Sequence, residues 1–236
     1  MRLTGRLAFC LFLISSLADL LGVYFGWHIL ALCAKPLIVP SLALSCLMSL
    51  KERGVGGKRV ATLMSAMVFG ALGDILLMFD GQNFFLAGLL AFLVGHFFYI
   101  FTMDARIDGT APEVACRSLL LAVLVVLTAG LSQLFDVKGV IGMSVTAYAC
   151  TFGYCLFAGI IAASNTKSRN YVWTVIGYVL FIISDSILAT GAFTDIRIPK
   201  RGFLVMLTYI LAQFLIASSL TREEIRRQNE IKRPAN

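Results

Sequence analysis

The chain has 236 residues, of which 59% are hydrophobic and 14% charged, and its mean hydropathy is +0.87. A soluble domain carries about 25% charged and about 45–50% apolar residues, so this composition excludes an ordinary soluble domain. The net charge of +7 forms no basic stripe interleaved with aromatic residues, so nucleic-acid binding is not expected.

The apolar residues lie in eight long blocks, which predict an all-α, polytopic membrane bundle of eight transmembrane helices. The whole chain, 1–236, is expected to be a single transmembrane domain, because the connections are too short to house a soluble one. The second block begins at Pro36 and could extend back toward Ile29. The expected spans cover about residues 7–26, 36–50, 60–79, 84–103, 117–135, 139–163, 171–191 and 202–220.

Lysine and arginine residues predict the orientation of these spans. Fifteen of the twenty fall at the two termini and in the connections after the second, fourth and sixth spans. Both termini are therefore expected to be cytoplasmic, in the plasma (inner) membrane if the protein is bacterial. Residues 221–236 are predicted to form a charged cytoplasmic tail, solvated rather than bound to lipid or to a partner. Arg2 and Arg6 imitate a signal peptide, but Asp19 interrupts the apolar run, so we treat it as the first span.

Metal and nucleophile motifs are missing from the sequence. Six cysteines are scattered without a C-x-x-C pair, and no P-loop, H-E-x-x-H or G-x-S-x-G motif occurs. With His28 and His96 as the only histidines, the sequence does not favour a histidine-rich zinc site. We expect no metal and no cofactor.

Two aspartates inside apolar spans are the candidate catalytic residues. Asp74 follows Gly73 and Asp185 follows Ser184, and both precede aliphatic residues. An ionised carboxylate at mid-helix costs roughly 2.5–3.5 kcal/mol, so such residues face a partner, a cavity or a reaction. Two carboxylates at one cavity could supply a proton donor and an ionised partner, as acid-catalysed hydrolysis requires. The alternative is that they only lock helices together through hydrogen bonds.

The two aspartates also suggest an internal repeat. Each lies about 14 residues into a span that runs in the same direction, so they are expected at equal depth in the outer half. Gly95-His96 in the fourth span resembles Ala212-Gln213 in the eighth. The pattern predicts a parallel repeat of four spans plus four, and a chance match of short apolar words is the alternative.

Other polar residues in the spans are candidate supports for substrate binding. His96 and Tyr99 share a helical face and could place the imidazole beside Asp74, while Tyr209 and Gln213 offer donors from the eighth span. Lys35 could hold a phosphate or pair with an aspartate, or simply reach the interface.

Asp19 is the weakest candidate, because it could lie close enough to the outer interface to be wetted. The spacing Gly22-x-x-x-Gly26 is more typical of helix packing than of function.

Five segments in chain order resemble the YhhN-like family of membrane proteins, which includes the lysoplasmalogenases. They are Lys35-Pro36-Leu37, Gly73-Asp74, Gly95-His96-x-x-Tyr99, Phe181 to Ser186 with Ser184 and Asp185, and Thr208-Tyr209-x-x-Ala212-Gln213. The resemblance implies an eight-helix enzyme that hydrolyses the vinyl ether bond of a lysoplasmalogen, with an ethanolamine or choline headgroup. It implies a lysophospholipid substrate and membrane lipids as partners, and leaves the oligomeric state open.

A proton-coupled transporter of a small amphiphile would use the same carboxylates and is the main alternative. A membrane protein without activity is a third. Paired Gly/Pro interruptions in both halves would favour transport, but Pro36 and Pro40 have no match in the second half.

Overall fold

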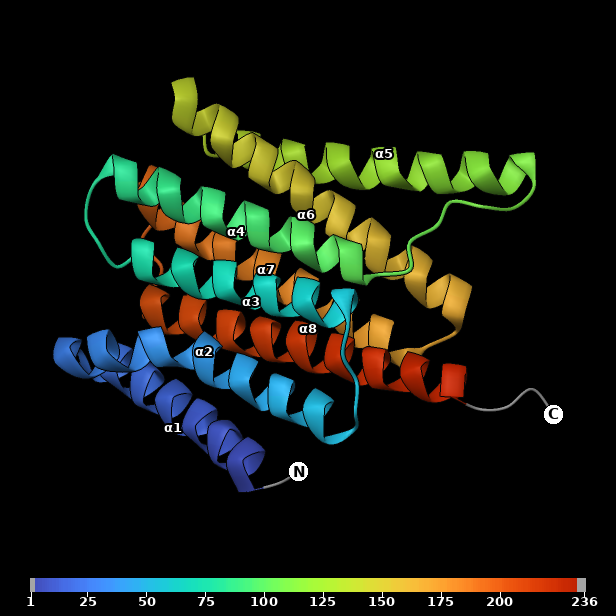
Figure 1. Ribbon diagram of the computed structural model, residues 1–236. Coiled ribbons are helices and arrows are strands. Elements are labelled where there is room, and N and C mark those ends of the chain that lie inside the picture. The colour runs from blue at the N-terminus through green and yellow to red at the C-terminus, as the bar shows by residue number, and fades with distance from the viewer. Residues whose placement is uncertain (1–2, 233–236) are drawn as a thin grey trace.

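The computed structural model describes residues 3–232, which form a bundle of eight helices without a strand (Figure 1). All eight helices in this part of the chain are long and apolar enough to cross a membrane. The predicted all-α membrane bundle is therefore confirmed. The helices are α1 (Leu3–Phe25), α2 (His28–Glu52), α3 (Lys58–Leu76), α4 (Gln82–Thr102), α5 (Ala111–Gln133), α6 (Gly139–Thr166), α7 (Arg169–Phe193) and α8 (Arg201–Lys232).

Two helices, α2 and α5, begin well before the apolar blocks predict, at His28 rather than Pro36 and at Ala111 rather than Arg117. The second starts at His28 and contains both Pro36 and Pro40 in its interior. Proline removes a backbone hydrogen bond, but a membrane helix tolerates it when neighbouring groups satisfy the freed carbonyls. The fifth starts at Ala111 because Thr110 and Glu113 form a capping box, in which the Thr110 amide donates to Glu113 Oε2 at 2.7 Å.

Consecutive helices pack as antiparallel hairpins, α1 with α2, α3 with α4, α5 with α6 and α7 with α8. The two termini therefore lie at one end of the bundle, which we call the terminal end, and the four hairpin connections lie at the other, the hairpin end (Figure 1). In the first hairpin, a Cβ atom on Gly22 would lie 2.8 Å from the Ala31 amide nitrogen, so glycine allows α1 and α2 to approach closely. Gly26 instead forms the turn, with φ of +76°. Which end faces the cytoplasm stays a prediction.

The helix α8 is central and α5 is peripheral. The former contacts α1, α2, α3 and α7, whereas α5 packs closely only on α6 (Figure 1). Large apolar side chains are exposed along the outer surface, with Leu119, Val126 and Leu127 on α5 among them. Such a surface suits lipid tails rather than water.

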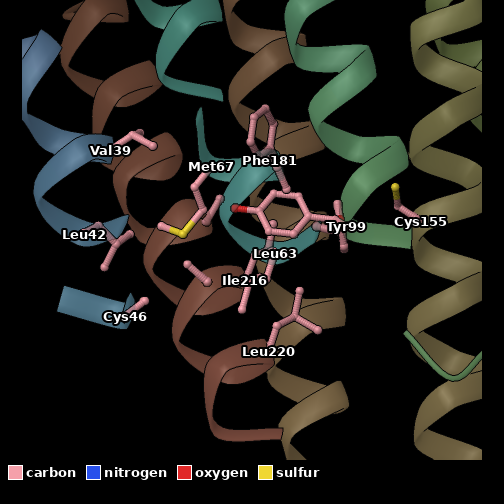
Figure 2. Packing of buried hydrophobic residues seen from close by; sticks show 14 of the residues in the cluster. Val39, Leu42, Cys46, Leu63, Met67, Tyr99, Cys155, Phe181, Ile216 and Leu220 are labelled. Atoms are coloured by element: carbon pink, nitrogen blue, oxygen red, sulfur yellow. The ribbon is translucent and has the colours of Figure 1, made fainter. Parts of the chain in front are cut away.

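The core lies where five or more helices meet. Figure 2 shows Val39, Leu42, Met67, Ile216 and Leu220 converging from α2, α3 and α8, with the Tyr99 ring reaching between them from α4. The same cluster includes Phe181 from α7 and Cys155 from α6. It separates the polar residues near the hairpin end from the charged residues at the terminal end.

The expected tail is largely part of α8, which stays helical through Lys232. The prediction that it is solvated is wrong for Glu223 and Glu224, which are buried. The Glu223 carboxylate accepts hydrogen bonds from Ser168 Oγ at 2.5 Å and Asn170 Nδ2 at 2.9 Å, and Glu224 forms an ion pair with Arg59 at 3.2 Å. Residues 233–236 of the predicted tail lie outside the described part of the chain.

Candidate active site

Asp74 lies in the last turn of α3 and faces α8. Its side chain is buried, and Asp74 Oδ2 accepts a hydrogen bond from the Tyr209 hydroxyl at 2.6 Å. The Tyr209 oxygen in turn accepts a hydrogen bond from Gln213 Nε2 at 3.0 Å, one helical turn along α8. The small residue before Asp74 is needed, because a Cβ atom on Gly73 would lie 2.7 Å from the Phe92 ring. The sequence-predicted residues Asp74, Tyr209 and Gln213 thus form one hydrogen-bonded chain.

Lys35 on α2 and Asp19 on α1 lie near Asp74. The Lys35 ammonium interacts electrostatically with both carboxylates, and these two carboxylates also interact with each other. Asp19 is only 1% exposed, and its Oδ2 atom has no hydrogen-bond partner among the described residues. The residue that the sequence ranked last is therefore part of the polar cluster.

A cavity of about 390 Å³ opens at the hairpin end between α1, α2, α7 and α8. Its charged lining residues are Asp19, Lys35 and Arg201, and His28 also lines it. Arg201 was not singled out from the sequence. Its guanidinium packs over Gly191 of α7, where a Cβ atom would overlap it. We call this the charged cavity.

Asp185 lies on α7 beside two smaller cavities of about 70 and 80 Å³. Asp185 lines both of them together with Val145, Tyr148 and Ala189, and most of the remaining lining is apolar. The Tyr148 hydroxyl interacts with the Asp185 carboxylate. We call these two spaces the apolar cavities.

The two candidate catalytic carboxylates are close enough to interact electrostatically. Aromatic rings pack near them, with the Phe181 and Tyr209 centroids 5.4 Å apart in an edge-on arrangement. Asp74 is 4% exposed behind Tyr209, whereas Asp185 is only partly buried. That both face one cavity stays a prediction.

The proposed pairing of His96 with Asp74 is wrong. Neither ring nitrogen of His96 has a hydrogen-bond partner among residues 3–232, and the imidazole lies among aromatic rings of α6 and α7. Its ring centroid is 4.7 Å from that of Phe152 and 5.0 Å from that of Phe181. The Tyr99 hydroxyl likewise has no partner in the described chain. Both residues are buried, and their role as supports for substrate binding stays a prediction.

Ser184, predicted as a supporting residue, joins two helices. Its Oγ donates to the Val205 carbonyl oxygen at 3.0 Å, which links α7 to α8. The serine is almost completely buried by this contact. We therefore predict that Ser184 stabilises the packing of α7 against α8.

A metal ion would need a group of neighbouring side chains that can bind it. Within the described residues, no three His, Cys, Asp or Glu side chains are grouped so that they could hold a metal ion. The expectation of a metal-free site stays a prediction.

Fold and polar core define a multi-pass integral membrane protein with carboxylates buried beside a charged cavity. The model of the YhhN family matches residues 30–220, so the chain belongs to that family. The chain is 32% identical to "Lysoplasmalogenase TMEM86A" of Homo sapiens over 158 residues, which are 65% of this chain and 62% of that protein. It is 30% identical to "Lysoplasmalogenase TMEM86B" of Sus scrofa over 179 residues, covering 76% and 72%. The matched part is thus less than two thirds of the human protein's length. No solved structure matches the chain.

Proposed function

We propose that the protein is a hydrolase that cleaves the vinyl ether bond of a lysoplasmalogen. The names of its relatives support this substrate class. The observation that carries the proposal is the position of the carboxylates. Asp74 and Asp185 interact electrostatically with each other. Asp185 lines the apolar cavities, while Asp74 interacts with Lys35 and Asp19, which line the charged cavity. An amphiphile with a phosphate headgroup and a hydrocarbon chain presents its ether bond between two such environments.

The chemistry requires an acid and then a base. One aspartate, kept protonated by burial, donates its proton to the β-carbon of the vinyl ether, which leaves an oxocarbenium ion. The ionised partner stabilises that cation and then takes a proton from the water that adds to the α-carbon. The hemiacetal collapses to a fatty aldehyde and a glycerophospho-ethanolamine or glycerophosphocholine. The geometry does not determine which of Asp74 and Asp185 is the acid and which is the base.

The remaining polar groups position the reactants. The Tyr209 hydroxyl fixes the orientation of the Asp74 carboxylate, and Gln213 fixes Tyr209. Tyr148 occupies the corresponding position beside Asp185. Lys35 lines the charged cavity, where its ammonium can hold the phosphate of the substrate.

The test is aldehyde release by purified protein in detergent, with lysoplasmalogen as substrate. A lysophospholipid with the same headgroup and an ester-linked chain is the control and should release neither aldehyde nor fatty acid. In heavy water the aldehyde should carry one deuterium next to the carbonyl, because the proton on the β-carbon comes from an exchangeable carboxyl. Absence of aldehyde from folded protein, together with proton-driven movement of the intact lipid into vesicles, would instead favour a transporter.

A further inference from the structure

The charged cavity contains groups of both signs at its lining. Lys35 from α2 and Arg201 from α8 supply two cations, and Asp19 from α1 supplies a carboxylate. Arg201 is confined there because its guanidinium lies against Gly191. Asp19 interacts electrostatically with Lys35, so charges of both signs lie close together in the lining. Such a lining matches a zwitterion better than a simple anion.

Among the residues that line the charged cavity, Asp19 is the one with a buried polar atom that lacks a hydrogen-bond partner in the described chain. It is almost wholly buried, and one of its carboxylate oxygens accepts no hydrogen bond from the described chain. A buried carboxylate oxygen without a donor is costly, so a donor supplied by a ligand would stabilise the occupied cavity.

The lining also indicates which amine fits. Quaternary ammonium groups are recognised by cages of aromatic rings, yet none of the residues lining this cavity, all within the described chain, is Phe, Tyr or Trp. A primary ammonium has three N–H donors for a carboxylate, whereas a trimethylammonium has none. The cavity therefore suits ethanolamine better than choline.

We propose that the charged cavity is a headgroup subsite for phosphoethanolamine lipids, in which Arg201 and Lys35 hold the phosphate and Asp19 accepts hydrogen bonds from the ammonium. This inference rests on the proposed function, since it names the headgroup of the substrate. Leu188 lines both the charged cavity and the larger of the two apolar cavities, so headgroup and chain can occupy adjoining spaces.

The test measures binding without turnover. Ester-linked lysophosphatidylethanolamine and lysophosphatidylcholine with the same chain, which contain no vinyl ether, are titrated calorimetrically into purified protein in detergent. The wild-type protein should bind the ethanolamine lipid about tenfold more tightly, because a charge-assisted hydrogen bond to a buried group differs by roughly that factor. Equal affinity for the two lipids would overturn the proposal.

Two variants separate the roles. Asp19→Asn should abolish the preference while leaving choline-lipid affinity little changed, and Arg201→Gln should weaken both lipids by a similar factor because both carry the phosphate. The matched controls are Asp136→Asn and Arg197→Gln, two exposed residues that do not line the cavity. A tenfold preference that survives Asp19→Asn, or an Arg201→Gln variant that binds both lipids as tightly as wild type, contradicts the assignment.

Glycerophosphoethanolamine distinguishes a lipid from a free headgroup. It should compete with the same dependence on Asp19 but much more weakly, because it lacks the chain. Competition as strong as that of the lipid would show that the cavity takes a free headgroup. Binding results that hold in a protein releasing no aldehyde would refute the proposed function while leaving the subsite in place.

Discussion

At the residue scale, the environment of Asp74 depends on one phenol. Tyr209 is a hydrogen-bond donor to Asp74 and an acceptor from Gln213, and all three side chains are buried. Removing the hydroxyl leaves the carboxylate without this donor and Gln213 Nε2 without its acceptor.

Tyr209→Phe should therefore lower kcat for aldehyde release by about tenfold, because leaving a buried polar group without its hydrogen bond costs about 1–3 kcal/mol and about 1.4 kcal/mol is a factor of ten in rate. The ring itself, which packs against Phe181 and Phe92, is retained. Tyr154→Phe is the control, since Tyr154 is exposed on α6. Unchanged kcat in the Tyr209 variant would remove this residue from the catalytic chain.

Ser184→Ala should behave differently. It removes only the bond from Ser184 Oγ to the Val205 carbonyl, and such interhelical bonds are worth about 0.6 kcal/mol in membrane proteins. We expect near-normal kcat and a slightly lower melting temperature, measured by assay and thermal denaturation. A large loss of kcat at unchanged stability would place Ser184 with the substrate instead.

The sequence reveals single residues better than their partners. Asp74, Tyr209 and Gln213 stand out because polar residues in apolar spans are expensive. Their connection, and the failure of His96 to join Asp74, depend on how each helix is rotated about its axis, which one sequence does not specify. Arg201 escaped notice because a cation at the end of a span is common at any membrane interface. Tyr148 was not singled out either, because a tyrosine within an apolar span is common in helix packing.

At the scale of elements, hydrophobic length predicts all eight helices, whereas their ends depend on polar contacts. The start of α5 is set by the capping box at Thr110, outside the apolar block. The end of α8 is extended by ion pairs with other elements, including Arg227 with Asp104 at 2.7 Å. A hydropathy window detects neither effect.

In this terminal extension of α8, the hydrogen bonds of Glu223 should contribute more to stability than those of any other residue. Glu223→Ala leaves the donors of Ser168 and Asn170 without their acceptor, which costs about 1–3 kcal/mol. We expect a clearly lower melting temperature in detergent. Glu230→Ala, which removes an exposed partner of Arg226, should change it little. Equal melting temperatures for the two variants would mean that the extension adds no stability.

At the scale of the whole molecule, some of the helix contacts fit a four-plus-four repeat. The pair α2 with α8 corresponds to α6 with α4, and the pair α2 with α3 corresponds to α6 with α7. The match is incomplete, because α1 packs on α8 while α5 has no comparable packing on α4. The contact pattern supports the repeat, which stays a prediction.

The orientation of the bundle is testable with reporter fusions. Fusions at Gly56 and Lys167, in connections at the terminal end, should report a cytoplasmic location, because lysine and arginine concentrate there. Fusions at Gln82 and Lys138, at the hairpin end, should report the opposite side. A reversed result at any two of these positions would invert the predicted topology.

The central claim is that Asp74 and Asp185 divide the acid and base roles, and the most direct measurement is kcat for aldehyde release by well-folded Asp→Asn variants. Asparagine is nearly isosteric and can still accept the hydrogen bond from Tyr209, so Asp74→Asn should fold. Each single variant should lose at least the ~10²-fold typical of a general acid or base. The double variant should be little slower than the poorer single one, because either loss already stops the reaction. Near-normal kcat in either single variant would contradict the two-carboxylate mechanism.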